Sequence, residues 1–162
     1  MTYDSDKGWP APGWSLGFGK MMYMGGTGGC MLVTSDGTRR SYDGTSTVYS
    51  GGTYYSSYYS GHTTDGSFID FTCNYSSSTY GTAFSGTATL ANGTTITYSS
   101  PTSTYDQAFP TQITDAQGNY INISYRFNAG PEISSITDTL GRVISFNYLK
   151  NGRLISITGA GI

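Results

Sequence analysis

The chain has 162 residues, a formal net charge of −2 and only 11% charged residues. This length fits a single domain with one core, and so low a charge content differs from that of helical cytosolic proteins. The 8 lysines and arginines are scattered, so neither nucleic acid nor anionic lipid is expected as a partner. Glycine (23 residues) and tyrosine (15 residues) are abundant, which favours an all-β fold of short strands and turns over disorder.

The N-terminal segment carries no recognisable targeting signal. It begins Met1-Thr-Tyr-Asp-Ser-Asp-Lys, which lacks the charged and apolar regions of a signal peptide. No apolar stretch approaches the roughly 20 residues that span a bilayer, so membrane insertion is not expected. An export signal, where one exists, is expected on sequence outside this chain.

Residues 13–17, Gly-Trp-Ser-Leu-Gly, fit the Gly-x-Ser-x-Gly pattern that presents a nucleophilic serine in α/β-hydrolases, here Ser15. In those enzymes a helix follows the serine. Here Met21 to Met24 lead instead into two glycines and a predicted hairpin. This context favours a buried Trp14 and Leu16 on a first strand over a nucleophile.

Three turn signals are each followed by an aromatic residue six positions after the Asp or Asn: Asp36-Gly37 with Tyr42, Asp65-Gly66 with Phe71, and Asn92-Gly93 with Tyr98. Such pairs favour type I′ turns, in which both central residues have positive φ. We therefore predict antiparallel hairpins near residues 30–42, 60–75 and 87–98. The third alternates most clearly, because threonines separate the apolar residues Ala88, Leu90, Ile96 and Tyr98.

Residues 49–80 are dense in Ser, Gly and Tyr and contain two adjacent tyrosine pairs. Adjacent residues of a strand face opposite sides, so at most half of these rings can lie in one core. Exposed aromatic rings can stack on sugars while polar neighbours bind sugar hydroxyls, although aromatic rings also join neighbouring strands within sheets. A carbohydrate site is one hypothesis, and its candidate residues are Tyr54, Tyr55, Tyr58, Tyr59 and Trp9.

His62 is the only histidine, so a serine-hydrolase relay would combine it with Ser15 and with Asp36, Asp65 or Asp70 as the orienting group. Ser15, His62 and Asp65 are the candidate catalytic residues of such an esterase or lactonase. A lone histidine directly before a hairpin turn is more often a solvated polar residue. The sequence therefore favours a protein without catalytic activity.

No cofactor or metal site is expected, because the chain has one histidine, 2 cysteines and no zinc-ligand spacing. Four turn aspartates could each bind calcium through turn carbonyls, but capping of their own turns is the favoured role: Asp36, Asp65, Asp115 and Asp138. Cys30 and Cys73 can form one disulfide or remain two thiols, and the sequence leaves both open.

The C-terminal third contains a repeat. Ile113-Thr-Asp-Ala-Gln-Gly-Asn-Tyr-Ile-Asn-Ile-Ser-Tyr125 recurs 23 residues later as Ile136-Thr-Asp-Thr-Leu-Gly-Arg-Val-Ile-Ser-Phe-Asn-Tyr148, and a truncated copy covers residues 151–158. Each unit is predicted to form turn, strand, turn and strand. One unit cannot cover its own apolar face, so stacking on neighbours is the expected source of stability.

These units resemble the YD repeats of Rhs proteins, teneurins and the shell subunits of insecticidal toxin complexes. That pattern is Tyr-Asp, a short spacer, Gly-Arg-Leu and a strand that ends in Tyr. The matching residues are Asp138, Gly141, Arg142, Val143 and Tyr148, with a less complete match at Asn151, Gly152, Arg153 and Leu154. Residues 12–16, Pro-Gly-Trp-Ser-Leu, with the hairpin that follows them, are similar to the stretch that precedes these repeats.

The repeats are degenerate, because Thr114 and Thr137 stand where the family prefers Tyr and Asn119 replaces Arg. Family members are usually far longer, and their repeats spiral into a hollow shell that encloses a toxin or decorates a cell surface. The resemblance implies that this chain is a fragment of such a wall, extracellular or at the cell surface. Its last repeat breaks off at Gly161-Ile162 and is expected to continue in a parent protein.

The sequence thus predicts one all-β domain over residues 1–162, with antiparallel hairpins stacked as an open, solenoid-like wall. Residues 1–100 hold the pre-repeat hairpins and residues 110–162 the degenerate YD-type repeats. Three functions are considered: a non-catalytic wall module, which is favoured, a carbohydrate-binding module, and a small serine hydrolase. The expected partners are a carbohydrate, the remainder of the parent protein, or a second chain at an open β edge.

Overall fold

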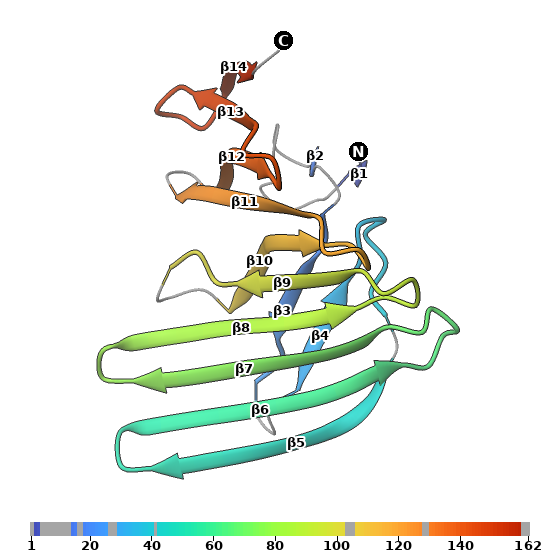
Figure 1. Cartoon of the computed structure of the whole chain (residues 1–162). Coiled ribbons are helices and arrows are strands. Elements are labelled where there is room, and N and C mark those ends of the chain that lie inside the picture. The colour runs from blue at the N-terminus through green and yellow to red at the C-terminus, as the bar shows by residue number, and fades with distance from the viewer. Residues whose placement is uncertain are drawn as a thin grey trace.

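The chain consists of β-strands and turns, without a helix, throughout the part that the computed structural model describes (Figure 1). That part comprises residues 2–3, 14–15, 18–25, 29–40, 42–102, 106–127 and 130–159, with residues 2–3 and 14–15 as backbone. The strands are β1 (Thr2–Tyr3), β2 (Trp14–Ser15), β3 (Lys20–Tyr23), β4 (Cys30–Val33), β5 (Tyr42–Gly51), β6 (Tyr54–Thr63), β7 (Asp70–Ser78), β8 (Gly81–Thr89), β9 (Thr95–Ser99), β10 (Gln107–Thr114), β11 (Tyr120–Phe127), β12 (Pro131–Asp138), β13 (Val143–Tyr148) and β14 (Leu154–Gly159). The predicted all-β class is confirmed.

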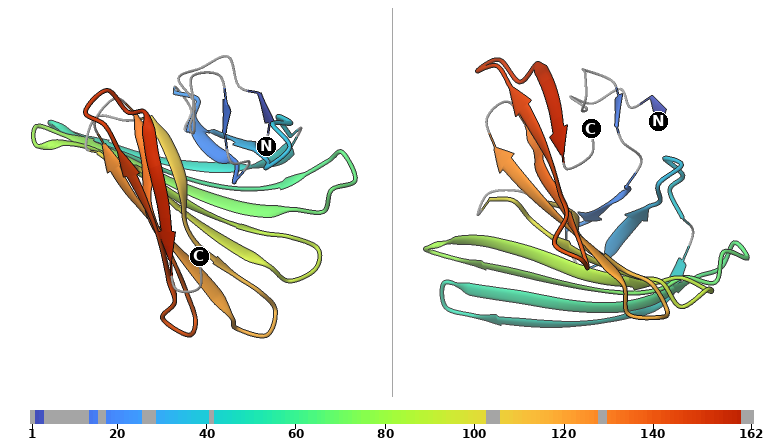
Figure 2. Two further views of the ribbon diagram at one scale, coloured as in Figure 1. Left: turned by 90° about the horizontal axis from the view of Figure 1, so that it is seen from above. Right: turned by 45° about the horizontal axis from the view of Figure 1, so that its top comes forward.

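Strands β5 to β14 form one antiparallel sheet in which neighbours along the chain are also neighbours in space. Among the described strands, β5 pairs only with β6 and β14 only with β13, so the sheet is open at both edges and does not close into a barrel. Strand β3 pairs with β4 and with β10, and the β3–β4 hairpin lies against one face of the sheet (Figures 1 and 2). The accumulated twist turns the C-terminal strands away from the direction of β5 to β8 (Figure 2).

Two of the three predicted glycine-turn hairpins are confirmed. The turn at Asp65-Gly66 joins β6 to β7, and the turn at Asn92-Gly93 joins β8 to β9. In the second hairpin Ala88 pairs with Ile96 on the buried face, as the alternation predicts. Strands β5 to β8 are 9 or 10 residues long and are joined by short connections.

The predicted hairpin over residues 30–42 is present only as a short reversal. The chain reverses at Asp36-Gly37, where Val33 bridges Arg39 and the Arg40 amide donates to the Leu32 carbonyl (3.1 Å), but the return segment forms no strand of its own among the described residues. Strand β4 pairs with β3 instead, and the chain continues from Tyr42 as β5, which pairs with β6. The chain turns where the sequence predicts, whereas the pairing partner is set by which strands cover the core.

The glycine turns also differ from the predicted type I′. Gly93 has a φ of 82°, whereas Asn92 is not among the described residues with positive φ. The Gly93 amide donates to the Leu90 carbonyl (2.9 Å) and the Leu90 amide donates to the Thr94 carbonyl (2.8 Å), the pattern of a type I turn followed by a left-handed glycine. Asn92 acts through its side chain, which accepts a hydrogen bond from the Thr94 amide (3.0 Å). The same backbone pattern occurs in the turns that begin at Thr34, Asp115, Asp138 and Leu149.

The main core lies between the β3–β4 hairpin and one face of the sheet, which we call the core face. Its buried side chains include Met21 and Leu32 from the hairpin and Phe71, Phe84 and Tyr98 from the sheet. Cys30 of β4 and Cys73 of β7 form a disulfide that ties the hairpin to the sheet. The pairing that the sequence left open is therefore present.

A second core cluster continues along the core face into the repeats. It contains Ile123, Ile133, Phe146 and Tyr148. Ile113 of β10 pairs with Ile96 of β9, which packs against the main core, so both clusters lie on the same face of the sheet. The repeats form the successive hairpins β10–β11 and β12–β13.

Candidate functional site

Strands β5 to β8 carry a polar face on the side of the sheet opposite the core face. Because cross-strand partners share a face, the register assigns each residue to one side. Tyr58 lies between Thr47 and Asn74, and Thr72 lies between Ser60 and Thr87. The polar face is formed by Asp43, Thr45, Thr47, Tyr49, Tyr54, Ser56, Tyr58, Ser60, His62, Asp70, Thr72, Asn74, Ser76, Ser85, Thr87 and Thr89.

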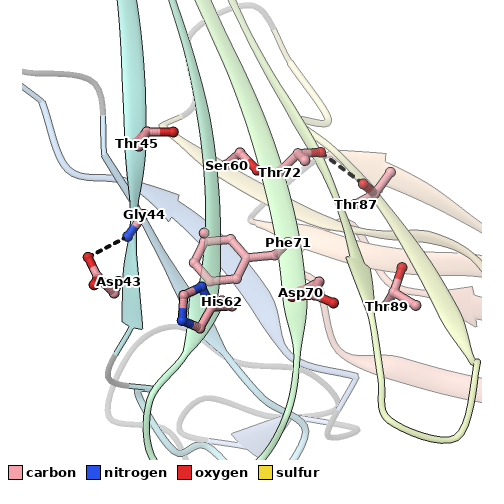
Figure 3. Close-up of a pocket in the computed structure, with 11 residues that line it drawn as sticks. Asp43, Gly44, Thr45, Ser60, His62, Asp70, Phe71, Thr72, Thr87 and Thr89 are labelled. Atoms are coloured by element: carbon pink, nitrogen blue, oxygen red, sulfur yellow. Dashed lines mark hydrogen bonds between the residues drawn. The ribbon is translucent and has the colours of Figure 1, made fainter.

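An open groove crosses the polar face where β6 approaches its turn (Figure 3). Its central row places His62 of β6 between Asp43 of β5 and Asp70 of β7, each of which is a direct cross-strand partner of the histidine. The row beside it consists of hydroxyl side chains. The complete lining is Asp43, Gly44, Thr45, Ser60, Gly61, His62, Asp70, Phe71, Thr72, Thr87 and Thr89.

Two glycines face each other at the floor of the groove, where Gly44 pairs with Gly61. A Cβ atom at Gly44 would overlap the Ser60 carbonyl oxygen and lie 2.7 Å from the Tyr59 hydroxyl, and one at Gly61 would lie 2.7 Å from the Tyr59 ring. Glycine is therefore required at both positions, because the Tyr59 ring packs against this stretch of backbone on the core face. The groove consequently has a backbone floor and polar walls.

Few of the polar side chains in the groove have a protein partner. Asp43 Oδ1 accepts a hydrogen bond from the Gly44 amide (2.8 Å), and the Thr72 and Thr87 hydroxyls are 2.9 Å apart (Figure 3). The side chains of His62 and Asp70 make no hydrogen bond to any other described residue. Two aspartates line the groove, and no lysine or arginine does.

The tyrosine pairs divide between the two faces, as strand alternation predicts. Tyr59 is 7% exposed on the core face, and Tyr55 on the same face forms an edge contact with Tyr75. Tyr54 and Tyr58 are each 45% exposed on the polar face, where Tyr54 also contacts Tyr49 of β5. Trp9, the fifth candidate, lies outside the described residues. The exposed rings of this region thus belong to the same face as the groove.

The candidate catalytic residues are placed on separate elements. Ser15 lies in β2, whose backbone pairs with β1, and its side chain is outside the described part. His62 lies in the groove, and its cross-strand neighbours are Asp43 and Asp70 rather than Asp65. Within the described residues, the hydrolase hypothesis therefore gains no assembled nucleophile and base.

Asp65 is occupied by its own turn. Its Oδ1 accepts hydrogen bonds from the Ser67 amide (3.1 Å) and the Ser67 hydroxyl (2.5 Å), and its Oδ2 lies 3.4 Å from Arg40 Nη1. The Ser67 hydroxyl, the backbone amide of Ser67 and Arg40 lower the pKa of Asp65. The Arg142 guanidinium likewise lowers the pKa of Asp138 in its turn. These aspartates thus have the turn-capping role that the sequence favours.

Asp43 is the charged groove residue that the sequence analysis does not identify, and the hydroxyl residues of the lining are not identified either. It lies in a strand of polar and small residues, Tyr42–Gly51, whose face assignment depends on the register with β6. Ser46 lies between Thr45 and Thr47, so polar residues occupy both alternating sets of positions in this strand, and their spacing gives no signal that would find Asp43. The sequence suggests Asp70 only as an orienting group for a hydrolase.

Across the described residues, no group of three or more His, Cys, Asp or Glu side chains is arranged to hold a metal ion. The same residues include no helix long and apolar enough to cross a membrane. The chain matches no protein-family model, no curated protein and no solved structure.

Proposed function

We propose that this chain is a non-catalytic wall module of a secreted or cell-surface protein, built in the manner of Rhs-type YD repeats. The observation that carries the proposal is the pairing of β10 to β14, in which each strand hydrogen-bonds to the next in chain order and the last has an unpaired outer edge among the described strands. Such a sheet can grow by adding further hairpins without changing those already present. That property is what a repeat-built wall requires.

The repeated turns support this interpretation. Asp115 Oδ1 accepts hydrogen bonds from the amides of Gln117 and Asn119, and 23 residues later Asp138 Oδ1 accepts hydrogen bonds from the amides of Leu140 and Arg142. The two repeats therefore reverse direction through the same side-chain contacts. A structural unit that depends on its own turn chemistry can be copied along a chain.

The disulfide supports the proposed location. A cross-link between Cys30 and Cys73 persists in oxidising surroundings and is rare in the reducing cytosol. The low charge content of the polar face, which is wetted mainly by hydroxyl groups, is compatible with an extracellular surface. Both features are expected of a secreted or cell-surface wall.

The proposal is tested by extending the wall. A further copy of residues 136–158 is fused after Ile162, and amide hydrogen exchange is followed across β14. A wall module should accept the added unit as new strands, so the outward-facing amides of β14 should gain protection and the denaturant midpoint should rise.

The matched control carries the same added residues in scrambled order, which removes the turn and the alternation but keeps the composition. It should leave β14 exchange unchanged. If the ordered copy exchanges as freely as the scrambled one, the sheet does not extend and the wall proposal is rejected.

A further inference from the structure

The wall proposal rests on the open edge of the sheet and makes no use of the polar face. We propose that the groove and the tyrosines next to it form a binding site for a neutral glycan chain. In this site Tyr58 and Tyr54 supply ring faces, and the Asp43, His62 and Asp70 row supplies hydrogen-bonding groups. This glycan site does not depend on the wall function, and it would give the wall module a ligand.

The geometry favours an extended ligand. Tyr54, Tyr58 and His62 are four residues apart along β6 and share the polar face. At a rise of about 3.3 Å per residue, each interval covers roughly 13 Å of surface. A chain of sugar rings lying along β6 would meet a tyrosine ring at two of these three positions and the polar row at the third, whereas a single sugar would reach only one of them.

The chemistry favours a sugar over other ligands. A pyranose has an apolar ring face that packs on an aromatic side chain and hydroxyls that donate to carboxylates. The groove and the neighbouring part of the polar face together offer both partners, because Tyr58 is exposed beside the groove while Asp70 and His62 within it lack hydrogen bonds to the rest of the described protein. A phosphate, a nucleic acid or an acidic glycan would meet two carboxylates and no lysine or arginine.

A partner protein fits this face less well. The cores of protein interfaces are apolar and depleted of charged groups. Here the tyrosines are separated by serine, threonine and asparagine, and the groove itself contains two aspartates. The paired backbone beneath them is already hydrogen-bonded within the sheet, so only side chains are available for recognition.

The site is proposed to bind the glycan and not to cleave it. Glycoside hydrolases keep one carboxylic acid in an apolar pocket so that it can protonate the leaving oxygen. Asp43 and Asp70 are both exposed on an open surface, one on each side of His62. The arrangement provides hydrogen-bond acceptors on both sides of the groove without an enclosed acid.

Affinity electrophoresis tests the proposal with the whole chain. Native gels containing hydroxyethylcellulose, laminarin or galactomannan serve as neutral probes, and a polygalacturonate gel serves as the acidic comparison. Retardation in at least one neutral gel is expected. Tyr58→Ala and Asp70→Ala should each weaken it by roughly tenfold or more, as expected for central contacts of a binding site.

Tyr80→Ala is the matched control, because Tyr80 is 98% exposed in the turn between β7 and β8. It belongs neither to the groove nor to the tyrosines of the polar face. It should migrate as the wild-type protein does in every gel. Circular dichroism of each variant confirms that the sheet is intact. Tyr58→Val and Asp70→Val, which suit a strand while removing the ring and the carboxylate, are used if an alanine variant fails to fold.

Three outcomes overturn the proposal. The first is free migration in all neutral gels, and the second is retardation that Tyr80→Ala removes as much as Tyr58→Ala does. The third is stronger retardation by polygalacturonate than by the neutral polysaccharides, which would indicate an acidic ligand. None of these results bears on the strand-addition test, so the glycan site and the wall function can fail separately.

Discussion

The sheet has two halves, β5 to β9 and the repeats β10 to β14, which are both built of antiparallel hairpins but differ in how the core face is covered. Over β6 to β9, the β3–β4 hairpin covers the sheet and a disulfide holds it there, so that Met21 and Phe84 are almost fully buried. Over β13 and β14, Ile144 and Ile157 lie on the same face but remain 37% and 46% exposed. The half under the β3–β4 hairpin has more polar strands and a separate hairpin over its core face. The repeat half has more apolar strands, and its core face is only partly covered.

This difference shows how stability is divided along the sheet. A strand such as β7 buries Phe71 and Cys73 because the hairpin supplies the opposite side of the core. A repeat unit has to obtain that cover from other units, which is why repeat proteins are stable as arrays. The covered half is therefore expected to anchor the chain, and the repeat half to be the part that extends.

The largest expected effect comes from emptying the covered core. Phe84 is 1% exposed and contacts Tyr23 and Tyr75. Phe84→Ala should lower the free energy of unfolding by about 3–5 kcal/mol, because it removes buried apolar surface and leaves a cavity. Denaturant unfolding followed by circular dichroism measures the loss.

The repeat half supplies the control for this substitution. Ile155 lies in β14 and is 59% exposed, so Ile155→Ala should change the same free energy by no more than about 0.5 kcal/mol. Equal losses in the two variants would contradict the division into an anchored half and an extending half.

The sequence predicted the parts of this division that rest on local signals. The alternation around Asn92-Gly93 placed Ala88 and Ile96 on the buried face, and the repeat placed the C-terminal turns. Strand β5 gave no such signal, because an exposed edge strand is held by backbone pairing and needs no apolar alternation. The position of Asp43 beside His62 depends on that pairing register, which lies outside the reach of composition and spacing.

The disulfide links the cover to the sheet and should have the second largest effect. It closes a separation of 43 residues between Cys30 and Cys73. Replacing both cysteines with alanine should reduce the free energy of unfolding by about 2–4 kcal/mol, mainly because the unfolded chain gains freedom. A reducing agent should produce a similar loss in the wild-type protein and none in the variant, which separates the cross-link from the packing of the two side chains.

A close approach of cover and sheet is expected at Gly86 of β8. A Cβ atom there would overlap Met21 Sδ of the hairpin and lie 2.5 Å from the Thr72 carbonyl oxygen. Gly86→Ala should cost about 1–3 kcal/mol, because the backbone contact cannot be relieved by a side-chain movement. Thermal unfolding monitors the change.

Gly118 provides the comparison from the repeat half. It has a φ of 86° in the turn between β10 and β11, and nothing lies within 4 Å of a Cβ atom added to it. Gly118→Ala should therefore cost about 1 kcal/mol through backbone strain alone. A larger loss at Gly118 than at Gly86 would show that the turn, and not the cover, limits stability.

The smallest expected effect is a pH dependence that originates in the cover. Burial, and the hydrogen bond from the Tyr23 hydroxyl to the Tyr55 hydroxyl (3.1 Å), raise the pKa of Tyr23 to about 12. In the unfolded chain a tyrosine titrates near pH 10. The contribution of Tyr23 to stability is complete below pH 10, and it is lost between about pH 10 and 12, because there the unfolded chain has released the proton that the folded chain still holds. Urea midpoints measured from pH 9 to 12 should therefore fall less steeply for Tyr23→Phe than for the wild-type protein. The control variant Ile155→Ala should retain the wild-type slope. Equal slopes in the wild-type protein and Tyr23→Phe would show that the loss of stability at alkaline pH does not originate in the β3–β4 hairpin.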